Sequence, residues 1–152
     1  MNNRLMMISV MLLSVLHPHV AIAQETFLGR SANQWSAALT SSEGQKRVHA
    51  AWAIVQLAAR SADEKNNHVH FAELVKLVRD SDPTVRYWGI HGLASLAQRQ
   101  RANDGGQAAV INTLEPLLAD KSPAPRIAAA QTLGVLGQSD KALPVLLAAM
   151  GA

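Results

Sequence analysis

The sequence predicts an all-α fold, a right-handed α-solenoid of about three and a half helix pairs. Three stretches read alike, GQKRVHAAWAIVQLA, PTVRYWGIHGLASLA and PAPRIAAAQTLGVLG, and their arginines Arg47, Arg86 and Arg126 follow at steps of 39 and 40 residues. Apolar residues keep fixed distances from each arginine; they are Leu39, Val78 and Leu118 upstream, and Ile54, Leu93 and Leu133 downstream. A period near 40 residues is typical of stacked helix pairs. Such pairs share a continuous core because one pair cannot bury its apolar face alone.

The first 23 residues predict export. Asn2, Asn3 and Arg4 precede an apolar run over residues 5–16, Pro18 ends it, and Ala21-Ile22-Ala23 supplies the small residues of a cleavage site. We therefore expect a signal peptide over 1–23, cleavage after Ala23, and a periplasmic or secreted mature protein. A membrane anchor is disfavoured because a bilayer span needs about 20 apolar residues, and a lipoprotein is excluded because the chain has no cysteine.

Composition indicates one small repeat domain over residues 24–152. Hydrophobic residues make up 49% of the chain, which suffices for a core, and the absence of cysteine excludes disulfides and thiolate metal sites. The formal net charge is +3, with no cluster of lysine or arginine. Nucleic-acid binding is not indicated, because it requires basic residues gathered on one face.

The first repeat, near residues 31–60, begins at Ser31, a suitable N-cap for a helix that carries Trp35 on its core side. The turn at 41–44 leads to a second helix over about 46–60, and the polar residues 61–69 predict a loop.

The second repeat, near 70–98, has a helix over about 71–78 and another over about 84–98. Between them, Asp80-Ser81-Asp82-Pro83 ends one helix and starts the next, since aspartate suits a cap and proline the first turn. Residues 99–107, with Gly105-Gly106, predict a second polar loop.

The third repeat, near 108–137, has a helix over about 109–119 that Pro116 should kink. A turn at 122–125 leads to a helix over about 126–136. A half repeat over 141–151 follows, whose helix at 142–150 is expected to pack on the fifth and sixth helices. Its apolar outer side predicts an edge for a homodimer, or for continuation in a longer parent chain.

The pattern P-x-V-R followed by small residues, as in PTVRYWGIHGL, resembles HEAT repeats, with departures at Gly44, Lys46 and Pro125. The resemblance implies a non-catalytic interaction scaffold. In HEAT repeats an arginine at the start of the second helix typically pairs with an acid of a neighbouring turn. Here that implies structural contacts between repeats, with an anion-binding row as the alternative; the residues are Arg47, Arg86, Arg126, Asp80, Asp82 and Asp120.

Residues 85–97, 122–137 and 141–146 are also similar to the HEAT tails that follow the catalytic domain of some secreted bacterial sulfatases. Such enzymes need a C/S-x-P-x-R motif, whereas this chain has no cysteine, and residues 122–126 place the motif residues in the wrong order. No sulfatase activity carries over. The resemblance leaves an alternative function, an accessory or truncated C-terminal repeat domain of a sulfatase-like hydrolase.

Candidate catalytic and metal-binding residues find simpler explanations. His68-Val69-His70 has no third ligand nearby in sequence, so a solvated loop is favoured over a metal site. Asp80 and Asp82 fit a helix cap better than an acid–base pair. Without a metalloprotease, phosphate-loop or nucleophile-elbow motif, the sequence predicts no enzyme activity, no cofactor and no metal.

The remaining candidate site is aromatic. The positions two and five residues after each arginine should lie on the concave face of the second helices; they are His49 and Trp52, Trp88 and His91, and Ala128 and Gln131. A cluster of exposed aromatic residues marks binding sites, so His49, Trp52, Trp88 and His91 are predicted to bind a protein or peptide. The alternative is that Trp52, Tyr87 and Trp88 fill space between repeats.

Overall fold

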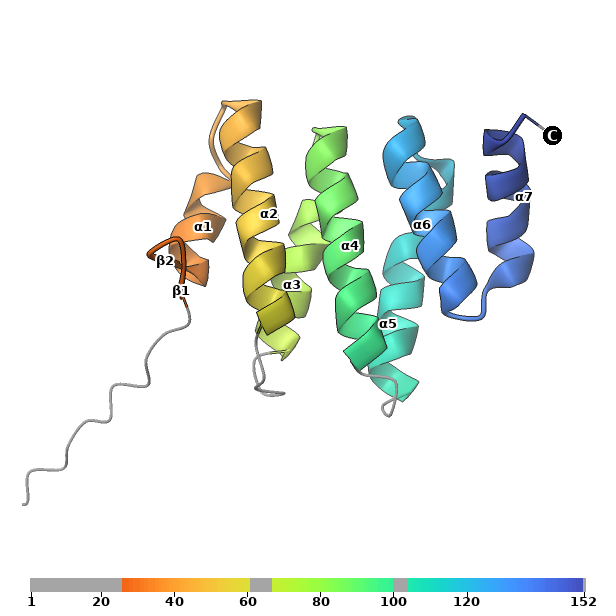
Figure 1. Cartoon of the computed structure of the whole chain (residues 1–152), viewed down its shortest axis with the longest axis horizontal. Helices are drawn as coiled ribbons and strands as arrows, with labels where there is room; N and C mark the ends of the chain where they lie inside the picture. The colour runs from red at the N-terminus through yellow and green to blue at the C-terminus, as the bar shows by residue number, and fades with distance from the viewer. Residues whose placement is uncertain (1–25, 61–66, 100–103, 152) are drawn as a thin grey trace, which may run out of the picture.

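The computed structural model describes residues 26–60, 67–99 and 104–151, and the predicted signal peptide lies outside these ranges. The described residues form an all-α solenoid, as predicted (Figure 1). Its helices are α1 (Ala32–Ala38), α2 (Gly44–Arg60), α3 (Asn67–Leu77), α4 (Pro83–Arg99), α5 (Asp104–Leu114), the 3-10 helix η2 (Glu115–Ala119), α6 (Pro123–Val135) and α7 (Ser139–Ala149).

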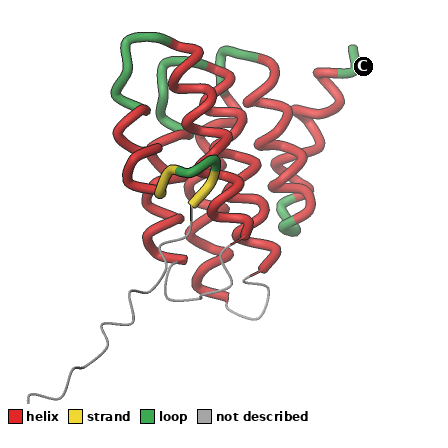
Figure 2. The backbone as a smooth tube through the Cα atoms, turned by 60° about the vertical axis from the view of Figure 1, so that its left-hand side comes forward, coloured by secondary structure: helices red, strands yellow, loops and turns green. Residues whose placement is uncertain are grey.

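The helices form two rows. The second helices α2, α4 and α6 pack side by side, while α1, α3 and α5 with η2 lie behind them, each against the second helix of its own pair (Figures 1 and 2). The last helix, α7, packs on α6 at the end of the stack.

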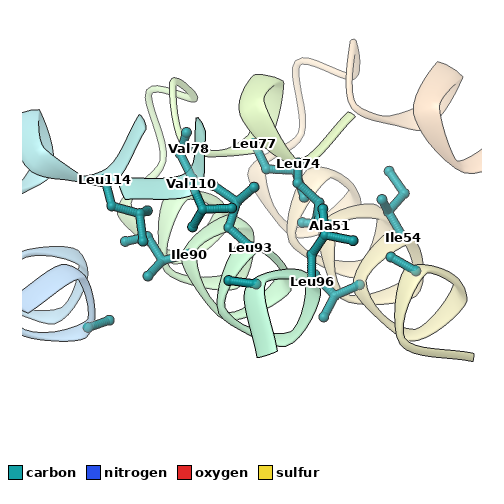
Figure 3. Close-up of a cluster of buried hydrophobic side chains, with 14 of the residues drawn as sticks. Ala51, Ile54, Leu74, Leu77, Val78, Ile90, Leu93, Leu96, Val110 and Leu114 are labelled. Carbon is teal, nitrogen blue, oxygen red and sulfur yellow. The ribbon is translucent and has the colours of Figure 1, made fainter. Parts of the chain in front are cut away.

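One apolar core runs along the stack between the rows. Figure 3 shows its central part, built from Ala51 and Ile54 of α2, Leu74 and Leu77 of α3 with Val78, Ile90, Leu93 and Leu96 of α4, and Val110 and Leu114 of α5. Because each of these side chains comes within a few per cent of complete burial, neighbouring pairs share one core, as expected for a solenoid.

Two glycines let α3 and α4 approach closely. A Cβ at Gly92 would lie 2.2 Å from Cδ2 of Leu74, and one at Gly89 would lie 2.7 Å from Cβ of Leu77 and 2.9 Å from the backbone nitrogen of Val78. These distances are far shorter than van der Waals contact. The glycines therefore serve packing, despite the helix-propensity cost of about 1 kcal/mol that each carries relative to alanine.

A short antiparallel hairpin precedes α1 and was not predicted. Strands β1 (Thr26–Phe27) and β2 (Arg30–Ser31) pair through a turn in which Leu28 and Gly29 have positive φ angles of 51° and 73°. Phe27 is buried, and its carbonyl accepts a hydrogen bond from Nε1 of Trp35 at 3.0 Å. The hairpin thus covers the outer end of the first pair.

Helix starts differ from the prediction at several places. Helix α2 begins at Gly44 rather than near residue 46, and α6 begins at Pro123 rather than near residue 126, so most of the predicted turn 122–125 belongs to α6. Helix α3 begins at Asn67 and α5 at Asp104, so the predicted loops 61–69 and 99–107 were wrong in their last residues. The polar sequence and the pair Gly105-Gly106 suggested loops, but these residues begin helices α3 and α5. In contrast, Ser31 caps α1 as predicted and forms a reciprocal capping box with Gln34.

Pro116 breaks the first helix of the third pair. The α-helix ends at Leu114 and the chain continues as η2, with the proline in its first turn. A proline lacks the amide hydrogen that an α-helix would require there. Helix α7 contacts α6 as predicted, and Lys141 at its start forms an ion pair with Glu115 of η2.

Candidate functional site

Arg86 connects two successive turns of the stack. Its Nη1 donates to the carbonyl oxygens of Asp80 and Ser81 at 2.9 and 3.0 Å, within its own turn. Its Nε and Nη2 donate to the two carboxylate oxygens of Asp120 in the next turn, at 2.7 and 2.8 Å. The hydrogen bonds from Arg86 lower the pKa of Asp120, and the carboxylate raises the pKa of Arg86.

Arg47 has the same arrangement with looser geometry. Its Nη1 donates to the carbonyl of Ser41 at 3.0 Å, and its Nε lies 3.3 Å from Oδ2 of Asp80 in the next turn. In both arginines, Nη1 donates to backbone carbonyls of the same repeat. Nε, on the other edge of the guanidinium, faces the aspartate of the following repeat.

Arg126 has only the first half of this arrangement. Its Nη1 donates to the carbonyls of Asp120 and Lys121 at 2.7 and 3.4 Å. Within residues 26–60, 67–99 and 104–151, its Nε and Nη2 meet no carboxylate.

Asp82 does not join these ion pairs, which corrects the prediction. Its Oδ1 accepts a hydrogen bond from the backbone amide of Thr84 at 2.8 Å, so the carboxylate caps the start of α4. Asp80 lies farther from α4 in sequence, yet it is the residue that faces Arg47.

Three rings gather on α4. Tyr87 and His91, four residues apart on one face of the helix, have ring centroids 4.4 Å apart, and Trp88 lies 5.8 Å from Tyr87 and 6.3 Å from His91. His91 is the most exposed of the three, although its ring is partly covered by Tyr87, whereas Tyr87 and Trp88 are half-buried and pack against the core. Tyr87 and Trp88 therefore fit the packing interpretation. His91, which lies against Tyr87 at the surface, fits the binding interpretation.

The four predicted binding residues do not form one ring cluster. Trp52 stacks edge-on against Phe27 of the hairpin, with centroids 5.0 Å apart and planes at 80°, and it packs against the core. His49 is exposed on α2. The structure thus brings Trp88 and His91 together, and places Trp52 in the N-terminal packing.

A shallow groove of about 180 Å³ lies between α4 and α6, beside the ring cluster. Its walls come from His91, Ala94 and Gln98 of α4, and from Ala128, Gln131, Thr132, Val135 and Leu136 on the α6 side. Three of these, His91, Ala128 and Gln131, stand at the positions two or five residues after an arginine. The others were missed. Ala94, Gln98, Thr132 and Val135 lie three, four or seven residues from those positions, a helical spacing that could have indicated them, whereas Leu136 does not.

Partial burial lowers the pKa of His91 below its usual 6.5. The lowered pKa favours the neutral imidazole, which can donate one hydrogen bond and accept another. With the amides of Gln98 and Gln131, the groove offers uncharged polar groups around an apolar floor.

The predicted metal-site alternative gains no third ligand. His70 lies in the first turns of α3 and is 7% exposed, so the solvated-loop interpretation was wrong for this residue. The side chain of His68 lies outside the described residues. In the described part of the chain, no three side chains of histidine, aspartate or glutamate group together as a metal ion would require.

Comparison with known proteins agrees with the helix-pair architecture. A family model described as HEAT repeats matches residues 72–152, which is more than half of the chain. No curated protein matches the sequence. Among helices α1 to α7, none combines the length and the apolar character needed to cross a bilayer.

Proposed function

Because the chain belongs to the HEAT-repeat family, we propose that it is a non-catalytic scaffold that binds a protein segment on the second-helix face, in the groove between α4 and α6. The observation that carries this proposal is the juxtaposition of the groove with the ring cluster of Tyr87, Trp88 and His91. Repeat proteins of this kind present extended surfaces formed by successive helices.

The size of the groove favours a side chain over a small molecule. Its volume of about 180 Å³ is below the roughly 300–1,000 Å³ of typical ligand pockets. It can hold one apolar or aromatic side chain of a partner, while Gln98 and Gln131 hydrogen-bond the partner's backbone. The groove lining contains no lysine, arginine, aspartate or glutamate, which favours an uncharged partner segment.

The test is site-specific crosslinking. In one protein a photoreactive residue replaces Gln131 in the groove. In the control protein it replaces His49, an exposed residue on α2 that stands two residues after Arg47 and does not line the groove. Crosslinks to a protein from an envelope extract should form from position 131, and Trp88→Ala with His91→Ala should abolish them. Equal crosslinking from position 49, or survival in the double variant, would place binding elsewhere.

Export is the second part of the proposal, and residues 1–23 support it through their positive start, apolar middle and Ala21-Ile22-Ala23. N-terminal sequencing of the protein from intact cells should give Gln24 as the first residue. An intact Met1 start would contradict export through this segment.

The alternative function is an accessory or truncated C-terminal repeat domain associated with a sulfatase-like hydrolase. Its support is the similarity of residues 85–97, 122–137 and 141–146 to the tails of such enzymes. A hydrolase recovered by crosslinking from position 131 would favour it, and recovery of proteins without any hydrolase domain would count against it.

A further inference from the structure

The groove between α4 and α6 continues a stripe of aromatic rings along α4. Tyr87 and Trp88 precede His91 by four and three residues, and Ala94 and Gln98 follow it by three and seven, so these residues share one side of the helix. The ring centroid of Trp88 lies 6.3 Å from that of His91, which lines the groove. The α4 side of the groove therefore has rings at one end, a small residue in the middle and an amide at the other end.

Several hydrogen-bond donors at the groove are unengaged. The hydroxyl of Thr132 is not among them, because it donates to the carbonyl of Ala128 at 2.9 Å within α6. In contrast, the exposed side-chain amides of Gln98 and Gln131 have no hydrogen-bond partner among the described residues, and neither has the indole N–H of Trp88. Each of these groups is neutral and can donate to a carbonyl oxygen of an occupant.

The spacing of the donors along α4 matches one backbone conformation of an occupant. His91 and Gln98 are seven residues apart, which puts their Cα atoms roughly 10.5 Å apart along the helix axis. In a polyproline II helix, residues three apart point to the same side and lie about 9.3 Å apart. In a β-strand, residues two apart point to the same side and lie only about 6.6–6.8 Å apart. The polyproline II repeat is thus the closer match.

The small size of the groove also favours an occupant that is ordered before it binds. A groove of about 180 Å³ buries little apolar surface, so the gain from that burial is small. A flexible segment would lose about 1–2 kcal/mol of backbone conformational entropy per residue that becomes fixed. A proline-rich segment already populates the polyproline II conformation and loses less.

An α-helix of a partner fits less well. Its diameter with side chains is about 10–12 Å, which is too wide for this groove. Its backbone carbonyls are also engaged within the helix, so they could not accept hydrogen bonds from Gln98 and Gln131. A polyproline II helix has no internal hydrogen bonds and leaves its carbonyls available.

We propose that the groove between α4 and α6 binds an uncharged, proline-rich segment of a partner protein in the polyproline II conformation. This inference rests on the scaffold function proposed above and specifies its partner. A pyrrolidine ring occupies the apolar floor beside Trp88 and His91, and carbonyls of the segment accept hydrogen bonds from Gln98 and Gln131. Aromatic-lined grooves are a recurring means of recognising such segments, and the lining carries no charged side chain that an uncharged segment would leave unpaired.

The test uses a fluorescently labelled peptide of repeated Ala-Pro-Pro units, titrated into the full chain and followed by fluorescence anisotropy. We expect saturable binding of this peptide and none of an equally long peptide of Ala-Gly-Gly units, which is also uncharged but is not ordered before binding. Gln98→Ala and Gln131→Ala should each weaken binding about fivefold, as expected when a hydrogen bond of about 1 kcal/mol is lost. Trp88→Ala should abolish it.

Matched variants keep the test decisive. Gln56→Ala removes an amide from α2 that does not line the groove, and it should leave peptide binding unchanged. Circular dichroism checks that each variant is folded. Because Gln98 and Gln131 are exposed, their variants decide the outcome even where Trp88→Ala disturbs the core.

Three results would overturn this inference. They are the absence of saturable binding of the proline peptide, equal binding of the glycine peptide, and affinities that Gln98→Ala and Gln131→Ala leave unchanged. The crosslinking experiment at position 131 separates this inference from the scaffold function. A crosslinked partner whose attached segment contains no prolines would overturn the proline-rich occupant and leave the scaffold function standing.

Discussion

Arg86 holds both carboxylate oxygens of Asp120, at 2.7 and 2.8 Å, while its third nitrogen holds two carbonyls of its own turn. The side chains of Arg86 and Asp120 are 15% and 6% exposed. A planar guanidinium with all three nitrogens engaged fixes the spacing of two turns, which a single point charge could not do. The pair therefore sets how the third repeat stacks on the second.

Asp120→Asn should cost more stability than Asp80→Asn. The first change removes a bidentate, nearly buried ion pair, and we expect a loss of about 3 kcal/mol, the lower end known for buried pairs. The second removes a single contact of 3.3–3.4 Å, for which about 1 kcal/mol is expected. Urea denaturation followed by circular dichroism measures both, and equal losses would contradict the ranking.

The same pair predicts acid sensitivity. The pKa of Asp120 is lowered in the folded state, so its contribution is present above the unfolded value of 3.8 and is lost as the pH falls through the folded pKa. Stability of the wild type should thus drop more steeply below pH 4 than that of Asp120→Asn. Parallel curves for the two proteins over this range would contradict the assigned role.

Gly89→Ala should destabilise the protein, whereas Gly134→Ala should not. A Cβ at position 89 would meet Cβ of Leu77 and the backbone of Val78 inside 3 Å, and backbone cannot move aside without shifting α3. At position 134 the nearest atom lies at 3.7 Å, so the gain in helix propensity of up to about 1 kcal/mol remains. Thermal unfolding of the two variants should shift in opposite directions.

His91 should titrate below its ordinary pKa of 6.5, because burial disfavours the charged imidazolium. The folded state then binds fewer protons than the unfolded state near that pH, so stability rises with pH through this window. NMR titration of the His91 ring protons measures the pKa directly. A value at or above 6.5 would show that the ring is solvated rather than packed on Tyr87.

Much of the fold could be predicted because the positions that face the core must be apolar, so they recur in the sequence with the period of the repeat. Trp35, Ile54, Leu93 and Leu133 are all buried where the period places them. Helix starts were harder, since the residues around Asn67 and Asp104 are polar or glycine in the sequence and carry no apolar period. The hairpin was missed because two-residue strands leave too short a pattern to recognise.

The candidate site could be predicted only in part, because a sequence period gives the side of a helix and not its neighbours. The positions of His91 and Gln131 relative to an arginine predicted that they face one surface, and both line the groove. The same rule placed Trp52 there, but the unforeseen Phe27 lies against its ring. Likewise Asp82 was expected to pair with an arginine, although the nearer amide of Thr84 engages it.

The hairpin affects which end of the helix stack unfolds first. Phe27, beneath the guanidinium of Arg60 and against Trp52, shields the outer end of the first pair, whereas α7 leaves Met150 in solvent. A stack held by nearest-neighbour contacts loses its ends first. Amide hydrogen exchange should therefore be fastest in α7 and slowest in α2 and α4. Local unfolding of the stack would then begin at α7 and not at the hairpin.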